Sequence, residues 1–143
     1  MKENYTLFQV PFISTVQEML LNSAKTYGNK LALEDLNATP IQRVTYNQLL
    51  ENVLKFGSAL KQLGLQERTH IAVIGENRVQ WGLTYLTAML FNYVIVPVDK
   101  NLSSNEILNI LHESENTSTS DSDSCRIFNI SFELKFLSTG TIT

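Results

Sequence analysis

Two pairs of neighbouring carboxylates have the residue types needed for acid-base chemistry. Glu34 adjoins Asp35, and Glu113 is followed two positions later by Glu115. A catalytic pair needs two environments that push the carboxyl pKa values apart, so that one group is protonated while the other is ionised. Both pairs are predicted to lie at the ends of secondary-structure elements, where charges are normally solvated. We therefore interpret them as surface charges, with catalysis as the alternative.

The candidate metal ligands and nucleophiles are equally sparse. His70 and His112 are far apart in the sequence, and the single Cys125 can form neither an internal disulfide nor, by itself, a zinc site. A phosphate-binding loop needs several glycines ahead of a helix, whereas Gly75 stands alone and is followed by the carboxylate of Glu76. These residues predict neither a metal site nor a dinucleotide site.

The unit that must position any site begins at Thr69 and ends at Val98. Residues 70–74 form a short apolar run typical of a strand buried on both faces, and residues 93–98 form a second such run. Residues 78–91 between them predict a largely buried helix, capped by Glu76 or Asn77. Strand, helix and strand predict a right-handed βαβ unit in a parallel sheet.

Aromatic residues of this unit are the candidates for lining a pocket. Trp81 and Tyr85 are four positions apart and share one face of the predicted helix, and Tyr93 opens the second strand. Core packing is the preferred interpretation for all three, with a pocket as the alternative.

Three capping boxes predict helices on either side of the central unit. Each has a hydroxyl residue whose side chain can cap the helix and a Glu or Gln three positions later that can reach back. The pairs are Thr15 with Glu18, Thr45 with Gln48, and Ser103 with Glu106. The first helix is expected to end at Gly28 and the second at Gly64. Residues 30–35 and 42–46 predict a β-hairpin between these two helices.

Apolar spacing predicts which faces of the first two helices are buried. On the second helix Gly57 is predicted to be a point of close packing, because glycine inside a helix costs up to about 1 kcal/mol relative to alanine. The first stripe comprises Val16, Met19, Leu20, Ala24 and Tyr27, and the second comprises Leu49, Leu50, Val53, Leu54, Gly57, Leu60 and Leu63.

Composition limits the function classes. A length of 143 residues suits one ordinary domain. The net charge of −3 and the lack of a basic cluster argue against a nucleic-acid partner. No apolar run approaches the roughly 18 residues of a membrane span, and the first residues lack the features of a secretory signal. We therefore expect a cytoplasmic protein.

Between residues 45 and 115 the sequence resembles the N-terminal part of adenylate-forming enzymes, specifically acyl-CoA synthetases of the long-chain fatty acid type. The resemblance rests on phrases at 45–49, 60–64, 69–73, 76–81, 96–99, 102–107 and 112–115, and the predicted elements at 15–27 and 31–33 fit the same family. Gln48 and Gln80 stand where the family usually has glutamate, and Lys100 where proline is common. The fold class implied is α/β: a fragment of the large N-terminal domain, with a mainly parallel sheet and covering helices.

The resemblance implies an ATP-dependent acid-thiol ligase. In the intact family ATP and a fatty acid form an acyl-adenylate with the help of magnesium, and coenzyme A then displaces AMP. The family's phosphate loop, adenine segment, ribose-binding aspartate and C-terminal lysine are not intact in this chain. The tail at Ser138, Thr139, Gly140 and Thr141 resembles only the start of a phosphate loop, and a strand-end turn explains it equally well. We therefore assign no catalytic or metal residue and no cofactor to this chain itself.

The sequence predicts two regions. Residues 1–115 form the synthetase-like part, and residues 116–143 form a divergent polar linker followed by a short β-like tail, with alternating apolar residues from Ile130 to Phe136. The preferred hypothesis is a truncated or altered synthetase fragment without adenylation activity. The alternatives are a non-catalytic interaction module, whose exposed sheet edge pairs with a second copy or a complementary C-terminal piece, and a degenerate product that folds poorly.

Overall fold

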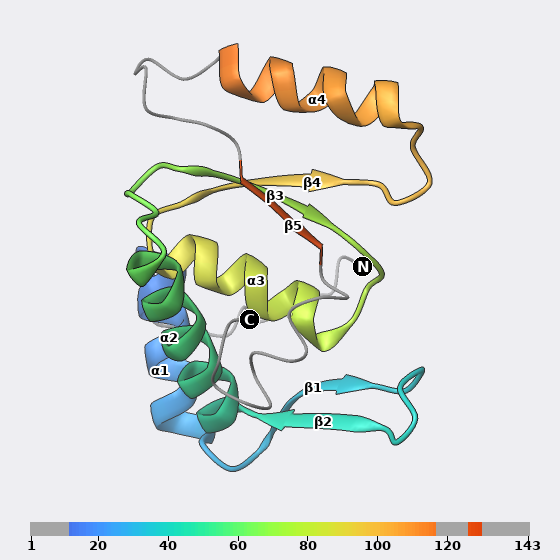
Figure 1. The fold of residues 1–143 in the computed structure, drawn as a ribbon. Coiled ribbons are helices and arrows are strands. Elements are labelled where there is room, and N and C mark those ends of the chain that lie inside the picture. The colour runs from blue at the N-terminus through green and yellow to red at the C-terminus, as the bar shows by residue number, and fades with distance from the viewer. Residues whose placement is uncertain (1–11, 117–125, 130–143) are drawn as a thin grey trace, which may run out of the picture.

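The computed structural model describes residues 12–116 and 126–129 (Figure 1). These residues form four helices and five strands. In chain order they are α1 (Val16–Tyr27), β1 (Leu31–Asp35), β2 (Gln42–Thr45), α2 (Tyr46–Gln62), β3 (His70–Ile74), α3 (Val79–Leu90), β4 (Val94–Val98), α4 (Ser104–Asn116) and β5 (Arg126–Asn129). The α/β class predicted from the sequence is confirmed.

Two separate sheets organise the fold. The larger has the order β4-β3-β5, and both pairings are parallel, with His70 opposite Val94 and Ile71 opposite Arg126. The predicted βαβ unit is therefore confirmed as β3-α3-β4. The smaller sheet is the predicted antiparallel hairpin of β1 and β2, which ends with Asp35 opposite Gln42. Figure 1 shows α3 on one side of the larger sheet and α4 on the other, while the hairpin lies beyond α3.

Strand β5 was not predicted from the sequence. The alternation that predicted a strand began at Ile130, and residues 130–136 lie outside the described residues. The structure instead pairs residues 126–129 with residues 71–74 of β3. A run of four residues with only two apolar members carries little periodic signal, so its strand character depends on the edge that β3 offers.

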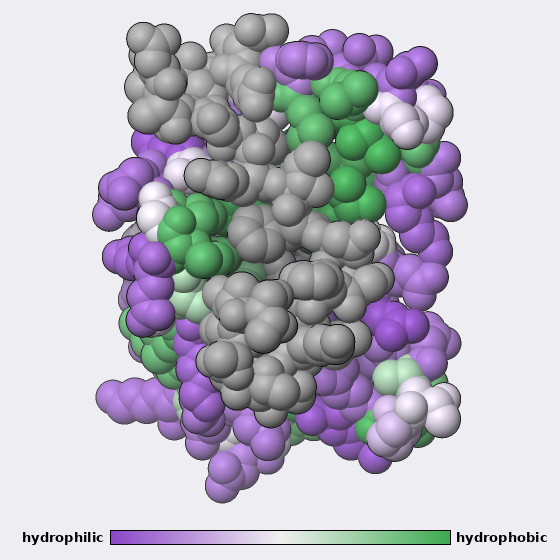
Figure 2. Space-filling model, viewed as in Figure 1, coloured by the Kyte–Doolittle hydropathy of each residue, from purple (hydrophilic) through white to green (hydrophobic). Residues whose placement is uncertain are grey.

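The two faces of the larger sheet have separate cores. Ile71 and Val73 of β3 point into the main core shared with α1, α2 and α3. Ala72 points the opposite way, into a smaller cluster with Val98 and Leu111. This alternation along one strand is the geometric consequence of the pleat. The smaller cluster is bordered by half-buried apolar residues, and Figure 2 shows the apolar area beside α4.

The helix faces differ in part from the predicted stripes. On α2 Leu54 and Leu63 are 44% and 51% exposed, whereas Phe56 and Ala59, which the stripe left out, are buried. On α1 only Leu20 and Ala24 are buried, and the predicted Val16, Met19 and Tyr27 are 36%, 40% and 45% exposed. The helical period was predicted correctly, but the buried face was not. On α2 the buried face differs from the predicted stripe because the helix packs against both α1 and α3.

The predicted capping boxes are formed with one correction. Thr45 and Gln48 cap each other's backbone at the start of α2, and Ser103 and Glu106 do the same ahead of α4. At α1 the Glu18 amide donates to the Thr15 hydroxyl as expected. The Glu18 carboxylate does not reach back to Thr15, however, because it accepts from the amide and hydroxyl of Ser14.

Gly57 is the predicted point of close packing between α2 and the end of α3. A Cβ atom built on Gly57 would overlap the ring of Phe91. That ring is held on other sides by Tyr93, stacked with a centroid separation of 6.3 Å, and by the Lys61 ammonium 5.4 Å from its centroid. Glycine at this position lets the aromatic ring lie directly on the helix backbone. The predicted helix ends are also confirmed, with Gly28 and Gly64 at positive φ.

Candidate functional site

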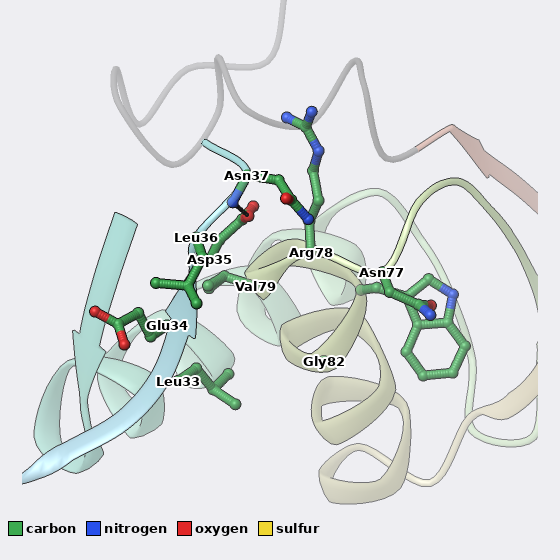
Figure 3. Close-up of a pocket in the computed structure, with 10 residues that line it drawn as sticks. Leu33, Glu34, Asp35, Leu36, Asn37, Asn77, Arg78, Val79 and Gly82 are labelled. Carbon is green, nitrogen blue, oxygen red and sulfur yellow. Dashed lines mark hydrogen bonds between the residues drawn. The ribbon is translucent and has the colours of Figure 1, made fainter. Parts of the chain in front are cut away.

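A cleft of about 460 Å³ separates the turn of the hairpin from the start of α3 (Figure 3). Its volume lies in the range of small-molecule sites. One wall comes from the end of β1 and the turn that follows it, and the other from the first turn of α3. The lining residues are Leu33, Glu34, Asp35, Leu36, Asn37, Asn77, Arg78, Val79, Trp81 and Gly82.

Asp35 ends β1 and organises the turn. Its Oδ1 atom accepts the backbone N–H groups of Asn37 at 2.9 Å and Ala38 at 3.1 Å, the local side-chain-to-backbone bonding typical of an Asx turn. The residue is only 5% exposed, and its Oδ2 atom is buried without a hydrogen-bond partner. The interpretation of Asp35 as a solvated surface charge is therefore wrong, because the turn folds over it.

Glu34 behaves as predicted for a charge near the surface. Its Oε1 atom lies 2.5 Å from Nε of Arg43, across the hairpin on β2. Directly opposed charges of this kind stabilise a strand pair modestly. Of the second predicted pair, Glu113 is exposed on α4, and the side chain of Glu115 lies outside the described part of the structure.

The α3 wall is fixed by a small ion network. Lys100 Nζ lies 2.6 Å from Glu76 Oε1, and Arg78 Nη2 lies 3.5 Å from Glu76 Oε2. The hydrogen bond and charge of Lys100, followed by the charge of Arg78, hold the pKa of Glu76 below its ordinary value. This engagement explains why Glu76 does not cap α3. The cap is Arg78, which makes no side-chain capping bond, so the prediction of Glu76 or Asn77 was wrong.

A buried amide pair ties the hairpin to α3. Gln80 is 2% exposed, and its Nε2 donates to Oε1 of Gln42 on β2 at 2.9 Å. Leu33 of β1 approaches Gly82 of α3, where a Cβ atom would make ordinary contact at 3.6 Å. The two walls of the cleft are thus held at a fixed separation by packed side chains.

The aromatic residues divide between pocket and core. Trp81 lines the cleft and stacks on Tyr85 with centroids 5.7 Å apart, and Tyr85 is 37% exposed. Trp81 thus fits both interpretations, because it is half-buried against the main core and also lines the cleft. Tyr93 is 4% exposed in the main core, as core packing predicted, and burial is the first cause that raises its pKa, followed by the charge of Glu67.

The remaining predicted candidates do not converge on this cleft. His70 is buried within β3 and His112 is exposed on α4. Ser138, Thr139, Gly140 and Thr141 lie outside the described residues, as does Cys125. Over residues 12–116 and 126–129 no three His, Cys, Asp or Glu side chains are placed to hold a metal. In the same residues no helix combines the length and apolar character needed to cross a bilayer.

The described lining side chains include no hydroxyl, thiol or imidazole. The groups among them that could act as a base or nucleophile are the carboxylates of Glu34 and Asp35. Glu34 is paired with Arg43, and Asp35 accepts from the backbone of the turn. The lining as a whole provides one buried acceptor, two amide side chains and several apolar groups. In the sequence, the pair Glu34 and Asp35 pointed to this site. No sequence feature indicated that Trp81 lines the same cleft.

Comparison with known proteins identifies the family of most of the chain. A family model described as AMP-binding enzyme matches residues 20–119. The chloroplastic long-chain-fatty-acid [acyl-carrier-protein] ligase of Arabidopsis thaliana is 31% identical over 100 residues, which cover 70% of this chain and 14% of that protein. Hexanoyl-CoA synthase of Cannabis sativa is 31% identical over 99 residues, covering 61% of this chain and 14% of that protein.

A solved structure shares the fold. The N-terminal subdomain of NpsA from Klebsiella oxytoca superposes with a TM-score of 0.69 at 15% sequence identity, covering 92% of this chain and 34% of that one. At this identity the likeness concerns the fold alone. The chain spans about 14% of the length of the two ligases.

Proposed function

Since the chain belongs to the AMP-binding, adenylate-forming enzyme family and corresponds to its N-terminal part, we propose that it serves the activation of a fatty acid as a coenzyme A thioester. The observation that carries this proposal is the family match over residues 20–119. The relatives named for long-chain fatty acid ligation and for hexanoyl-CoA synthesis support an aliphatic acid as the substrate class.

The family implies ATP, magnesium and coenzyme A for the intact enzyme, and the described residues do not fit the first two. The turn before α3 offers one glycine, Gly75, and then the carboxylate of Glu76, which would repel a phosphate. Magnesium prefers several oxygen ligands, and residues 12–116 and 126–129 contain no cluster of three metal-binding side chains. The nucleotide chemistry therefore needs groups other than these.

We further propose that the 143-residue chain is inactive by itself. Adenylation depends on positioned donors and a metal at the transferring phosphoryl group, and removing them removes most of the transition-state stabilisation. The sequence lacks the family's intact phosphate loop, adenine segment and C-terminal lysine. We also propose that the chain divides into a family-like region, residues 1–115, and a divergent region, residues 116–143. The proposed location is the cytoplasm. The nucleotide sequence beyond codon 115 tests that division.

The second candidate function is pairing with a complementary polypeptide. Strand β4 is an edge of the larger sheet among the described strands, because the order is β4-β3-β5. An edge strand presents backbone N–H and C=O groups that another strand can bond. Val94, Ile95 and Val96 are only half-buried there, so added chain would also cover apolar surface.

An assay of pyrophosphate release tests the proposed inactivity and the proposed pairing. The purified chain is incubated with ATP, magnesium and fatty acids from hexanoate to oleate. We expect no release from the chain alone. We expect release after it is mixed with the part of the Arabidopsis ligase that follows the aligned region. That ligase's own N-terminal piece serves as the positive control, and an unrelated protein as the negative control.

Activity from the chain alone would overturn the proposed inactivity. A monodisperse monomer that restores no activity, while the control piece does, would overturn the pairing. Pyrophosphate release with amino acids, and none with fatty acids, would overturn the substrate class.

A further inference from the structure

The turn of the hairpin carries two exposed aliphatic side chains, which we call the hairpin tip. Leu36 directly follows β1 and Ile41 directly precedes β2, so the two flank the turn next to the paired Asp35 and Gln42. Leu36 is 68% exposed and Ile41 is 46% exposed. Turn residues are commonly small or polar, because turns lie in water. One exposed leucine needs no explanation, but two aliphatic groups that project together beside a cleft indicate a contact surface.

A hollow with apolar lining lies directly beside the hairpin tip. It is the cleft of about 460 Å³, whose α3 wall presents Val79, Trp81 and Gly82. Leu36 stands at the edge of this cleft on the hairpin side, as Figure 3 shows. Because most of the Leu36 side chain is in solvent, it does not fill the cleft. The same face of the molecule therefore combines an apolar projection with an apolar hollow.

The α3 wall of the cleft is positively charged. Among the described residues, the charged side chain that lines this wall is Arg78. Its Nη2 atom is 3.5 Å from Glu76, whereas Lys100 Nζ is only 2.6 Å from the same carboxylate. One carboxylate can balance only one of two cations. The guanidinium of Arg78 thus keeps a positive charge that Glu76 does not cancel.

The hairpin wall of the cleft is negatively charged. Its two charged lining residues are Glu34 and Asp35, and only Glu34 is paired with a cation, Arg43 on β2. The two walls therefore have opposite charge. In a two-fold interface a patch meets a copy of itself, so the hairpin wall of one copy faces the α3 wall of the other. A strongly acidic or basic peptide would instead match one wall and be repelled by the other.

We propose that the hairpin tip and the cleft form a two-fold interface between two copies of this chain. Leu36 of each copy packs into the cleft of the other, against Val79 and Trp81, and the oppositely charged walls fix the orientation. The patch is small, and interfaces below about 1,200 Å² in total are typically transient. This surface goes beyond the proposed function, whose pairing uses the edge of β4. Figure 1 shows α3 between the hairpin and the sheet that contains β4.

Sedimentation equilibrium and native fluorescence test the proposal together. We would measure the full chain from about 1 to 500 μM, the range in which a weak dimer forms. The mass should rise from that of one chain to that of two and no further, because a two-fold contact is closed. Trp81 is the sole tryptophan of the sequence and lines the cleft. Its emission should shift with the same midpoint as the mass, since the partner's leucine displaces water from the cleft.

One pair of variants separates this surface from general stickiness. Leu36→Asp should raise the dissociation constant of the dimer at least about tenfold, because each dimer loses two central apolar contacts. Leu54→Asp is the matched control, since Leu54 is 44% exposed on α2 and does not line the cleft. Its dissociation constant should stay within about twofold of that of the unaltered chain. Far-ultraviolet circular dichroism checks that both variants are folded.

The salt dependence of the unaltered chain needs no variant. Raising NaCl from about 50 to 500 mM should weaken the dimer about two- to fivefold, because exposed charge pairs are screened. A monomer over the whole range would overturn the proposal, as would unchanged association in Leu36→Asp, a mass above two chains, or association that salt does not weaken. Any of these results would leave the fatty-acid activation proposal unaffected, since pyrophosphate release measures it.

Discussion

Replacing each of two helical glycines by alanine should shift stability in opposite directions. Alanine is favoured over glycine inside a helix by about 1 kcal/mol. Gly57→Ala adds a Cβ that overlaps the Phe91 ring, whereas Gly82→Ala adds one that meets Leu33 at an ordinary 3.6 Å. Overpacking of this kind typically costs about 1–3 kcal/mol. Because the added Cβ overlaps the ring directly, the upper part of this range, about 2–3 kcal/mol, applies at Gly57. We therefore expect Gly82→Ala to stabilise the chain by about 0.5–1 kcal/mol and Gly57→Ala to destabilise it by about 1–2 kcal/mol.

The sign at Gly57 depends on whether the ring can move away. Phe91 is half-buried and lies between its contacts with Tyr93 and Lys61, so displacement breaks these contacts. Phe91→Ala removes the obstacle. In that background Gly57→Ala should become stabilising by up to about 1 kcal/mol, because only the helix propensity is left.

Urea denaturation followed by far-ultraviolet circular dichroism and by Trp81 fluorescence measures all four variants. With a slope of about 1–3 kcal/mol per molar urea, a change of 1 kcal/mol shifts the midpoint by several tenths molar. An unchanged or raised midpoint for Gly57→Ala would refute the packing argument. A destabilising effect that persists in the Phe91→Ala background would refute the assignment to this ring.

Two further predictions test the helix faces and caps. Leu60→Ala should lower the free energy of unfolding by about 2–5 kcal/mol because Leu60 is 1% exposed. Leu63→Ala should lower it by less than about 0.5 kcal/mol because Leu63 is 51% exposed. Urea midpoints measure both changes. The Ser103 hydroxyl and then its backbone amide hold the pKa of Glu106 below the ordinary 4.5, so the stability from this cap is complete above pH 4.5 and is lost as the pH falls through the lower folded value. Ser103→Ala should raise the Glu106 pKa toward 4.5 in a carboxyl ¹³C titration, and an unchanged value would contradict this.

Local chemistry explains which parts of the fold were predictable. The β3-α3-β4 unit follows from two β-branched runs around a long apolar helix, and the capping pair of Thr45 and Gln48 fixes the start of α2 within a few residues. The buried arc of α2 could not be read from periodicity, because it depends on where α1 and α3 pack. The seven-residue stripe therefore included the exposed Leu54 and Leu63 and missed Phe56.

Residue type alone led to the wrong prediction that Asp35 is a solvated surface charge. A carboxylate at a strand end is normally solvated, and this general expectation held for Glu34 next to it. Asp35 differs because consecutive strand residues face opposite sides, so its side chain turns inward where that of Glu34 turns outward. The turn then closes over it through the N–H groups of Asn37 and Ala38. Alternation in β1 predicts two faces, and the packing of the hairpin against α3 decides which of them lines the cleft.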